Sequence, residues 1–240
     1  MKTLLLILSL FASSTALADG VLTPAANPPD ATLYDYRTSI KEQDDFLGAA
    51  SSTGNVGKLG WGVSFGTTSQ TAPSAGRYGL ITRDTSAASG TAASMVLNGN
   101  QTVFLGSTLH KILFVAKLNQ VDANTSVWYG AAATSGSVPN DGIWIEKRDA
   151  DTNWFCVTRA ASTQTRTDSG VAVTTDYTTF AYDRTSANVM FYINGNLVCT
   201  HTSNIPTAAL DPATVIINSA AASKTHTIDY FEMQIYGMTR

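Results

Sequence analysis

The sequence predicts an all-β fold in which antiparallel strands form two sheets that pack as a sandwich. Short runs of alternating apolar and polar residues recur along the chain, separated by clusters of Gly, Asn, Asp and Ser. No segment of useful length shows the spacing of apolar residues that is typical of a helix. Charged residues make up only 14% of the 240 residues, whereas the surfaces of long helices normally carry many Glu and Lys side chains.

The first 18 residues have the pattern of a signal peptide. Lys2 provides a short positive region, the run from Leu4 to Phe11 is apolar, and Ala16-Leu17-Ala18 is a small-x-small cleavage pattern. This apolar run is shorter than the roughly 20 residues that a membrane-spanning helix needs. We therefore expect residues 1–18 to be removed on export, which leaves a secreted chain without a membrane span. An uncleaved N-terminal membrane anchor is the alternative.

Residues 19–30 form a proline-rich lead-in, and residues 31–240 are expected to form one β-sandwich domain, since sandwiches often use this length as a single unit. No repeat of fixed period is visible, which disfavours propellers and solenoids. The clear strand-like runs span Lys111–Leu118, Val127–Ala131, Gly142–Lys147, Trp154–Arg159, Tyr177–Tyr182, Val189–Ile193 and Tyr230–Tyr236.

The net charge of −3 and the isoelectric point near 5.5 offer no positive surface for phosphate groups. Proteins that bind nucleic acid usually concentrate Lys and Arg on one face. We therefore expect no nucleic-acid partner.

The strongest local signal is a hairpin over residues 189–202. Asn194-Gly195 lies between two β-rich runs, and these two residue types tolerate the positive φ angles of a type I′ turn. A two-residue loop fixes the register, so that Met190 lies opposite Cys199. The face that carries Phe191 is apolar and is predicted to be the core face, with Met190 and Cys199 on the opposite face.

A second hairpin is predicted over residues 142–159, with residues 149–153 as its loop. This loop would place Glu146 opposite Cys156. Because side chains alternate along a strand, one face then carries Trp144, Glu146, Trp154 and Cys156, and the other carries Ile143, Ile145, Phe155 and Val157. The second set is apolar and is predicted to be the core face.

The chain contains two cysteines, Cys156 and Cys199. Export to an oxidising compartment would allow a disulfide between them. A disulfide needs Cα atoms within about 7 Å, and for two side chains outside the core this requires neighbouring strands of one sheet. The order of strands is not readable from the sequence, so a disulfide and two half-buried thiols both stay open.

Several segments resemble the concanavalin A-like (laminin G/legume-lectin type) jelly-roll modules of tailed-phage structural proteins. The resemblance implies two stacked antiparallel sheets, one convex and one concave, with the first and last strands near each other. It also implies a non-enzymatic role on a virion or cell surface. The segments that carry it are DDFLG (44–48), GNVGKLGW (54–61), GRYGLITRDT (76–85), residues 142–173, residues 189–206 and IDYFEMQIYG (228–237).

The same fold carries glycoside hydrolases and polysaccharide lyases, so we searched for their chemistry. A retaining glycosidase needs two carboxylates about 5.5 Å apart, which related enzymes place on one strand as Glu-x-Asp-x-Glu. Asp44 and Asp45 are adjacent and point to opposite faces, while Glu146 and Asp149 are three apart across a strand end. The histidines are scattered, at positions 110, 201 and 226. The sequence therefore predicts a protein that is not an enzyme.

Asp149, Asp151 and Asn153 alternate in one loop, as oxygen ligands do in calcium sites. The loop lacks a glycine at its bend and a bidentate glutamate after it, and an Asp- and Asn-rich hairpin turn explains the same residues. We expect no cofactor and no metal ligands, with calcium as the alternative.

For recognition of a glycan, exposed aromatic rings would stack on sugar faces while carboxylates bond the hydroxyl groups. The candidates are Trp144 and Trp154 with Glu146 on the predicted non-core face, followed by Trp128 and Tyr129. The alternative is that these large aromatic side chains are packing residues.

Together these observations predict a non-enzymatic structural or adhesive recognition module on a virion or cell surface. Its partner would be a glycan or a protein surface, in a homo-oligomer or in a capsid or tail assembly. The alternative is a secreted, lectin-like polysaccharide-binding protein. A polysaccharide-active enzyme is the third and least favoured hypothesis.

Overall fold

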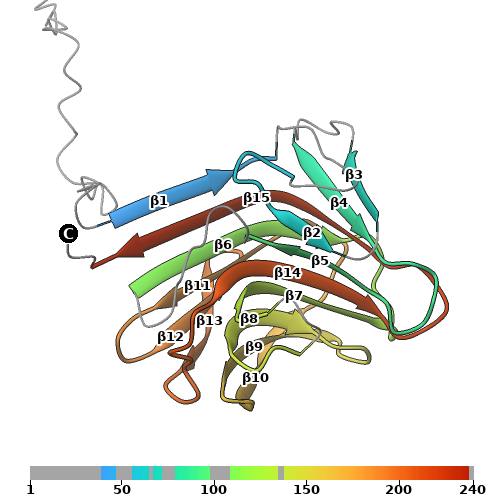
Figure 1. Ribbon diagram of the computed structural model, residues 1–240. Coiled ribbons are helices and arrows are strands. Elements are labelled where there is room, and N and C mark those ends of the chain that lie inside the picture. The colour runs from blue at the N-terminus through green and yellow to red at the C-terminus, as the bar shows by residue number, and fades with distance from the viewer. Residues whose placement is uncertain are drawn as a thin grey trace, which may run out of the picture. The chain divides into compact units, whose positions relative to one another are not determined.

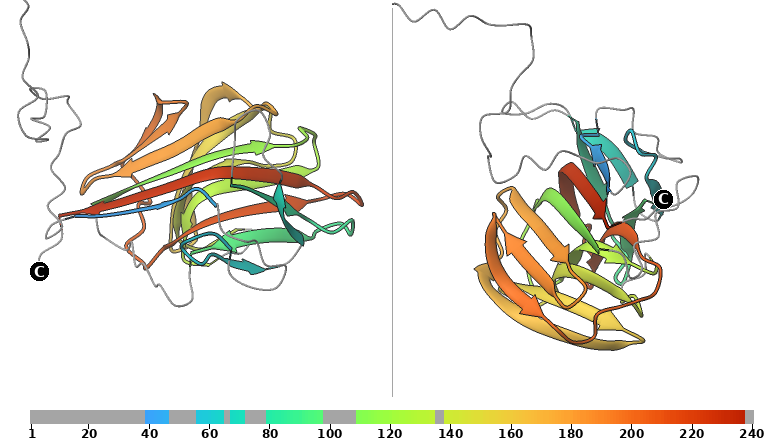
Figure 2. Two further views of the ribbon diagram at one scale, coloured as in Figure 1. Left: turned by 90° about the horizontal axis from the view of Figure 1, so that it is seen from above. Right: turned by 90° about the vertical axis from the view of Figure 1, so that its left-hand side faces the viewer.

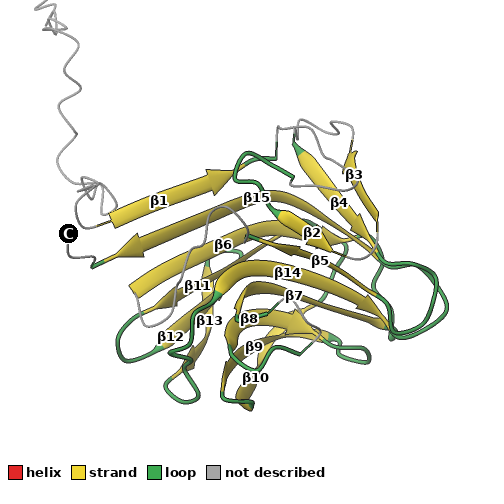
Figure 3. Cartoon of the chain, in the orientation of Figure 1, coloured by secondary structure: helices red, strands yellow, loops and turns green. Residues whose placement is uncertain are grey.

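A computed structural model describes residues 39–46, 56–64, 67–71, 79–97, 109–134 and 138–237. The predicted signal peptide and the proline-rich lead-in lie outside these residues. The chain divides into a unit over Met1–Tyr34, which is not described, and a compact unit over Asp35–Arg240, which contains the fold. Every regular element in the described ranges is a strand (Figure 3), so this part of the chain has no helix that could cross a membrane. The predicted all-β class is confirmed.

One sheet has eight strands in the order β13-β12-β11-β6-β15-β4-β3, with β1 also paired to β15. Its strands are β1 (Ser39–Asp44), β3 (Thr67–Thr71), β4 (Leu80–Asp84), β6 (Leu109–Leu118), β11 (Thr178–Arg184), β12 (Val189–Ile193), β13 (Asn196–His201) and β15 (Thr225–Tyr236).

The other sheet has seven strands in the order β10-β9-β8-β7-β14-β5-β2. Its strands are β2 (Gly62–Ser64), β5 (Ala92–Val96), β7 (Thr125–Ala132), β8 (Gly142–Lys147), β9 (Asn153–Ala160), β10 (Thr163–Ala172) and β14 (Asp211–Asn218).

All strand pairs within the two sheets are antiparallel. The first strand, β1, pairs over its whole length with the second half of the last strand, β15 (Figure 1). Seen from the end, β11–β13 belong to one layer and β8–β10 to the other (Figure 2). This is the two-sheet antiparallel sandwich that the alternating sequence pattern predicts.

The core lies between the sheets and is rich in aromatic side chains. Trp61 packs edge-on against Phe231, with ring centroids 4.7 Å apart, and Tyr129 stacks on Phe180 at 4.7 Å with an interplanar angle of 10°. All four side chains are buried. Each such ring buries a large apolar area, which makes these contacts a main source of stability.

The β12–β13 hairpin turns at Asn194-Gly195, whose φ angles of 51° and 77° suit a type I′ turn. The register begins as predicted, with Ile193 opposite Asn196, but an irregularity follows between Phe191 and Tyr192. Beyond it Cys199 lies opposite Phe191, on the core face. The predicted placement of Cys199 beside Met190 is therefore wrong, because one bulged residue reverses the alternation.

The β8–β9 hairpin differs from the prediction by one residue. Glu146 lies opposite Phe155, and Ile145 lies opposite Cys156. A one-residue shift in register moves a whole strand to the opposite face. Trp154 and Cys156 are therefore in the core, and their predicted placement on the face of Trp144 and Glu146 is wrong.

A disulfide joins Cys156 to Cys199, with Cα atoms 6.4 Å apart. It links β9 of the seven-stranded sheet to β13 of the eight-stranded sheet, across the core. The prediction that a bridge requires neighbouring strands of one sheet is wrong, because both cysteines point inward and meet between the layers. Near this bridge Nε2 of His201 bonds the Thr167 hydroxyl at 3.0 Å, which holds β13 to β10.

The core also encloses His226, whose Nδ1 lies 3.2 Å from the Tyr129 hydroxyl. Burial, together with the smaller effect of the positive charge of Arg83, lowers the pKa of His226 to about 3. The unfolded chain binds this proton near pH 6.5. The neutral imidazole therefore contributes full stability above that pH, and this stability is lost as the pH falls toward 3.

We expect the free energy of unfolding to fall by about 1.4 kcal/mol per pH unit between roughly pH 6 and pH 4 because of His226 alone. Urea titrations at several pH values measure this slope. The His226→Gln variant lacks the group that binds the proton, so its slope should be smaller by about 1.4 kcal/mol per pH unit. An unchanged slope in that variant would contradict the assignment.

Candidate functional site

The outer face of the seven-stranded sheet, which points away from the core, carries the residues of most chemical interest. Strand registers align its side chains in rows that run across β14, β7, β8, β9 and β10. One row contains Asp211, Ala132, Gly142, Arg159 and Gln164; the next contains Ala213, Gly130, Trp144, Val157 and Arg166; and a third contains Val215, Trp128, Glu146, Phe155 and Asp168.

Two tryptophans occupy the middle of this face. The rings of Trp128 and Trp144 have centroids 5.7 Å apart, and both side chains are almost fully buried in a second apolar cluster that is separate from the core. The Trp144 ring covers Gly142, since a Cβ at that position would lie 2.6 Å from Cζ3 of the indole. At Gly130 a Cβ would run into the backbone oxygen of Ile143. Glycines therefore let the indole lie close against the sheet.

Glu146 follows Trp144 on the same face of β8 and accepts hydrogen bonds at both carboxylate oxygens. The Trp144 Nε1–H donates to Oε2 at 2.7 Å. Oε1 receives Nε of Arg166 at 2.6 Å and Nε of Arg148 at 2.7 Å. The Glu146 side chain is only 5% exposed, whereas that of Arg148 is 42% exposed. Glu146 is thus a buried carboxylate that contacts a partly exposed arginine.

A second carboxylate meets the same guanidinium. Nη2 of Arg166 donates to Oδ2 of Asp151, and this oxygen also accepts the backbone N–H of Arg148 at 2.8 Å. The guanidinium stacks 3.5 Å above the Phe155 ring. Because one planar fork contacts both acids, the carboxyl groups of Glu146 and Asp151 are held close together. We call Glu146, Asp151, Arg148 and Arg166 the carboxylate pair and its arginines.

The loop between β8 and β9, which resembles a calcium loop in sequence, encloses a lysine ammonium. Nζ of Lys147 donates to the backbone oxygens of Thr125 at 2.7 Å, Asp122 at 2.9 Å and Arg148 at 3.2 Å, and also to that of Asp149. The Asp149 side chain bonds the Ser126 hydroxyl. Among the described residues, no three His, Cys, Asp or Glu side chains gather as metal ligands.

Of the residues predicted to contact sugar, the structure brings Trp128, Trp144 and Glu146 together and separates the other two. Tyr129 points into the core against Phe180, and Trp154 packs there with ring centroids 4.5 Å from Phe180. Tyr129 and Trp154 are packing residues, as their buried positions between the sheets require.

The outer face also holds buried polar atoms that lack a hydrogen-bond partner. These are Nε1 of Trp128, Nε of Arg159 and Oδ1 of Asp211. Burial raises the pKa of Asp211. Buried polar groups are nearly always bonded in native proteins, so these three atoms are exceptions on this face. Along β14 this face extends about 20 Å, from Asp211 to Ile217.

Sequence reasoning missed Asp151 as a partner of Glu146. The spacing of acids along a strand points to Asp149 instead, which is three residues from Glu146. Asp151 reaches the site from the loop and contacts Arg166 of β10, which lies 15 residues further along the chain. The sequence signal that these residues offer is weak: Glu146 is followed by the polar strand β10, which carries Arg166 on the same face of the sheet.

No family model matches the sequence, and no curated protein matches it. Solved structures do match. A protein of unknown function from Shewanella oneidensis MR-1 has a TM-score of 0.57 at 12% identity, covering 85% of this chain and 89% of that one. A β-glucanase of Bacillus licheniformis has a TM-score of 0.55 at 15% identity, covering 80% and 97%. A Crh5 transglycosylase has a TM-score of 0.53 at 17% identity, covering 83% and 85%.

These likenesses confirm the concanavalin A-like jelly-roll fold that the sequence predicted. The phage part of the resemblance finds no support among them. The prediction of a non-enzymatic structural or adhesive module is overturned, because the similar structures include glucanases and transglycosylases. A pattern of two acids on one strand does not detect a pair such as Glu146 and Asp151, which come from a strand and from a loop.

Proposed function

We propose that the chain is a polysaccharide-active enzyme that cleaves glycosidic bonds at the outer face of the seven-stranded sheet. The observation that carries this proposal is the carboxylate pair, in which one Arg166 guanidinium holds Glu146 and Asp151 beside two tryptophans. Glycoside cleavage needs two carboxyl groups on either side of the scissile bond.

The closeness of the two acids favours a retaining reaction, since inverting enzymes leave room for a water molecule between them. Glu146 attacks the anomeric carbon as the bond from that carbon to the glycosidic oxygen breaks, and Asp151 protonates the leaving oxygen. Water, or a hydroxyl group of a second sugar, then displaces Glu146 and gives its proton to Asp151. Hydrolysis and transglycosylation differ only in this acceptor, and the reaction requires two carboxyl groups and no cofactor.

Substrate would reach Glu146 from the side of the partly exposed Arg148. Because Glu146 is only 5% exposed, sugar hydroxyl groups that displace Arg148 would have to bond its carboxylate in turn, since a buried charge is costly to leave unpaired. Export, which the pattern of residues 1–18 predicts, would place the protein where polysaccharides occur.

We expect Glu146→Gln and Asp151→Asn each to lower kcat at least a hundredfold on a β-1,3-glucan or a mixed β-1,3-1,4-glucan, because each removes one ionisable group of the pair. Release of reducing ends measures the rate, and thermal melting shows whether each variant is folded.

Asp168→Asn is the matched control. Asp168 lies on the same face of β10 and bonds Asn153 and the backbone N–H of Gly170, without contact to the carboxylate pair. Its turnover should equal that of the wild type. If Glu146→Gln kept full turnover, or if the folded wild type cleaved no polymer in a broad panel, the proposal would be wrong.

A further inference from the structure

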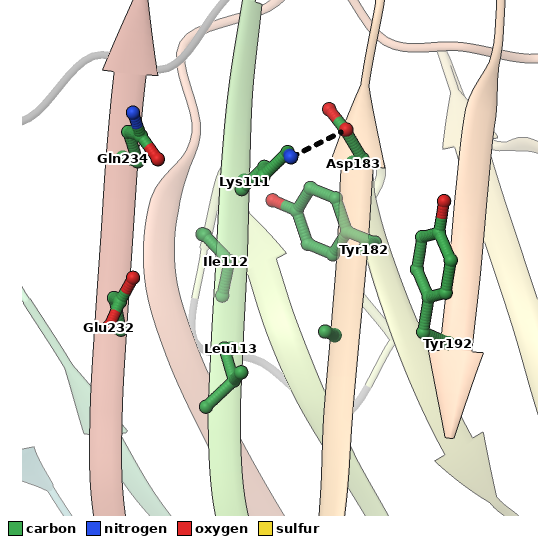
Figure 4. A pocket seen from close by; sticks show the side chains of 9 residues that line it. Lys111, Ile112, Leu113, Tyr182, Asp183, Tyr192, Glu232 and Gln234 are labelled. Atoms are coloured by element: carbon green, nitrogen blue, oxygen red, sulfur yellow. Dashed lines mark ion pairs between the residues drawn. The ribbon is translucent and has the colours of Figure 1, made fainter. Parts of the chain in front are cut away.

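The outer face of the eight-stranded sheet, on the opposite side of the sandwich, holds an open groove of about 190 Å³. Figure 4 shows it between β12 and β15, with Tyr192 on one side and Glu232 on the other. Registers place Ala181 and Leu113 between these two residues, as the floor. Lys111 and Asp183 form an ion pair at one end with an N–O distance of 3.2 Å, beside Gln234.

The charges of the groove are balanced and already paired. Lys111 neutralises Asp183, and Lys41 on β1 lies 2.9 Å from Glu232. The phenol of Tyr230 donates to Glu232 at 2.8 Å, and that of Tyr236 donates to Asp183 at 2.5 Å. Hydrogen bonds and the charge of Lys41 lower the pKa of Glu232 against the opposing effect of burial. A strongly anionic or cationic ligand would find no excess of opposite charge here.

The groove combines an aromatic and aliphatic surface with a polar wall, which suits a neutral ligand that has both apolar and hydroxyl surfaces. The ring of Tyr192 is half-buried and borders a floor of small and aliphatic side chains. Carboxylates, an amide and an ammonium surround that floor, and these groups bond sugar hydroxyls well. The volume is below the roughly 300 Å³ of a typical small-molecule site, so the groove accommodates about one sugar unit of a chain.

We propose that this groove is a second, non-catalytic binding site for one unit of a neutral polysaccharide, on the face opposite the catalytic site. It goes beyond the proposed cleavage reaction, because it would hold the polymer at a place where no bond is broken. The catalytic proposal is not needed for it: binding here depends on Tyr192, Ala181 and the polar wall alone.

The test uses the full folded chain carrying Glu146→Gln, so that turnover does not consume the ligand. Ala181→Trp fills the floor of the groove without removing a wall contact, and Tyr192→Ala removes the aromatic wall. Thr179→Trp is the matched control, since Thr179 lies two residues along the same strand, on the same face, outside the groove. Binding of a neutral β-1,3-glucan hexasaccharide is followed by NMR through the methyl signals of Ala181 and Leu113.

We expect the hexasaccharide to shift both methyl signals in the Glu146→Gln background. Ala181→Trp and Tyr192→Ala should each weaken this binding at least tenfold, while Thr179→Trp leaves it unchanged. Binding to Ala181→Trp is measured from the Leu113 methyl signals, and binding to Tyr192→Ala from those of both residues. Unshifted signals, binding unaffected by Ala181→Trp, or shifts produced only by charged oligosaccharides would overturn the inference. Shifts without any polymer cleavage by the wild type would reject the catalytic proposal and leave this one standing.

Discussion

Replacing Cys156 and Cys199 together with alanine is expected to lower the free energy of unfolding by about 4 kcal/mol. The disulfide closes a loop with a sequence separation of 43 residues, and cross-linking such a loop removes conformations from the unfolded chain. Both cysteines are buried in the core, so the alanines add small cavities to the loss. Urea denaturation monitored by tryptophan fluorescence measures the difference.

The wild type itself provides the control for the cavities. Denaturation in the presence of a reductant breaks the bond while both side chains stay in place, and it should account for most of the loss. If the reduced protein and the double variant both unfolded at the wild-type urea concentration, the cross-link would contribute nothing and the account of the two layers would need revision.

Lys147→Met is expected to destabilise the fold by about 3 kcal/mol. Lys147 is 1% exposed, and four backbone oxygens, from β7, the turn before it and the β8–β9 loop, lie within hydrogen-bond distance of its ammonium. Methionine has a similar volume but no donor, so the backbone oxygens of Asp122, Thr125 and Asp149 lose the ammonium as a partner, while that of Arg148 still accepts the backbone N–H of Asp151. Desolvation lowers the pKa of Lys147, and the nearby carboxylates, led by Asp151, oppose this effect.

Lys117→Met is the matched control for Lys147. Lys117 lies on β6 and only reaches over the Tyr177 ring, with its Nζ 5.1 Å from the centroid. Its removal should change the stability by less than about 0.5 kcal/mol. Equal effects of the two substitutions would show that the backbone oxygens around Lys147 are satisfied by water instead.

Sequence patterns predicted the local pieces of this fold well where a turn fixed the register. Asn194-Gly195 produces the expected two-residue loop with positive φ angles. The prediction failed after two residue pairs, because a bulge near Val198 leaves the residue types unchanged while it turns Cys199 into the core. In the β8–β9 hairpin a one-residue error in loop length had the same effect on Trp154.

The candidate site was predictable only in part. Trp144 and Glu146 were identified from alternation along β8, and they do share the outer face of their sheet. Arg166 comes from β10, a polar edge strand without alternation of apolar residues. Asp151 comes from a hairpin loop whose residue types are common in such loops and indicate no functional role. Two successive hairpins, β8–β9 and β9–β10, bring these residues together, and the one-residue difference in the β8–β9 register shows that alternation alone does not fix which side chains meet.

The central claim is that Glu146 and Asp151 act together as a retaining pair. The most direct test is proton NMR of the first products released from a mixed β-1,3-1,4-glucan by the folded wild type. We expect the new reducing ends to appear first in the β-configuration and to reach the α/β equilibrium only later. A first product in the α-configuration, or none from any polymer in the panel, would contradict the claim.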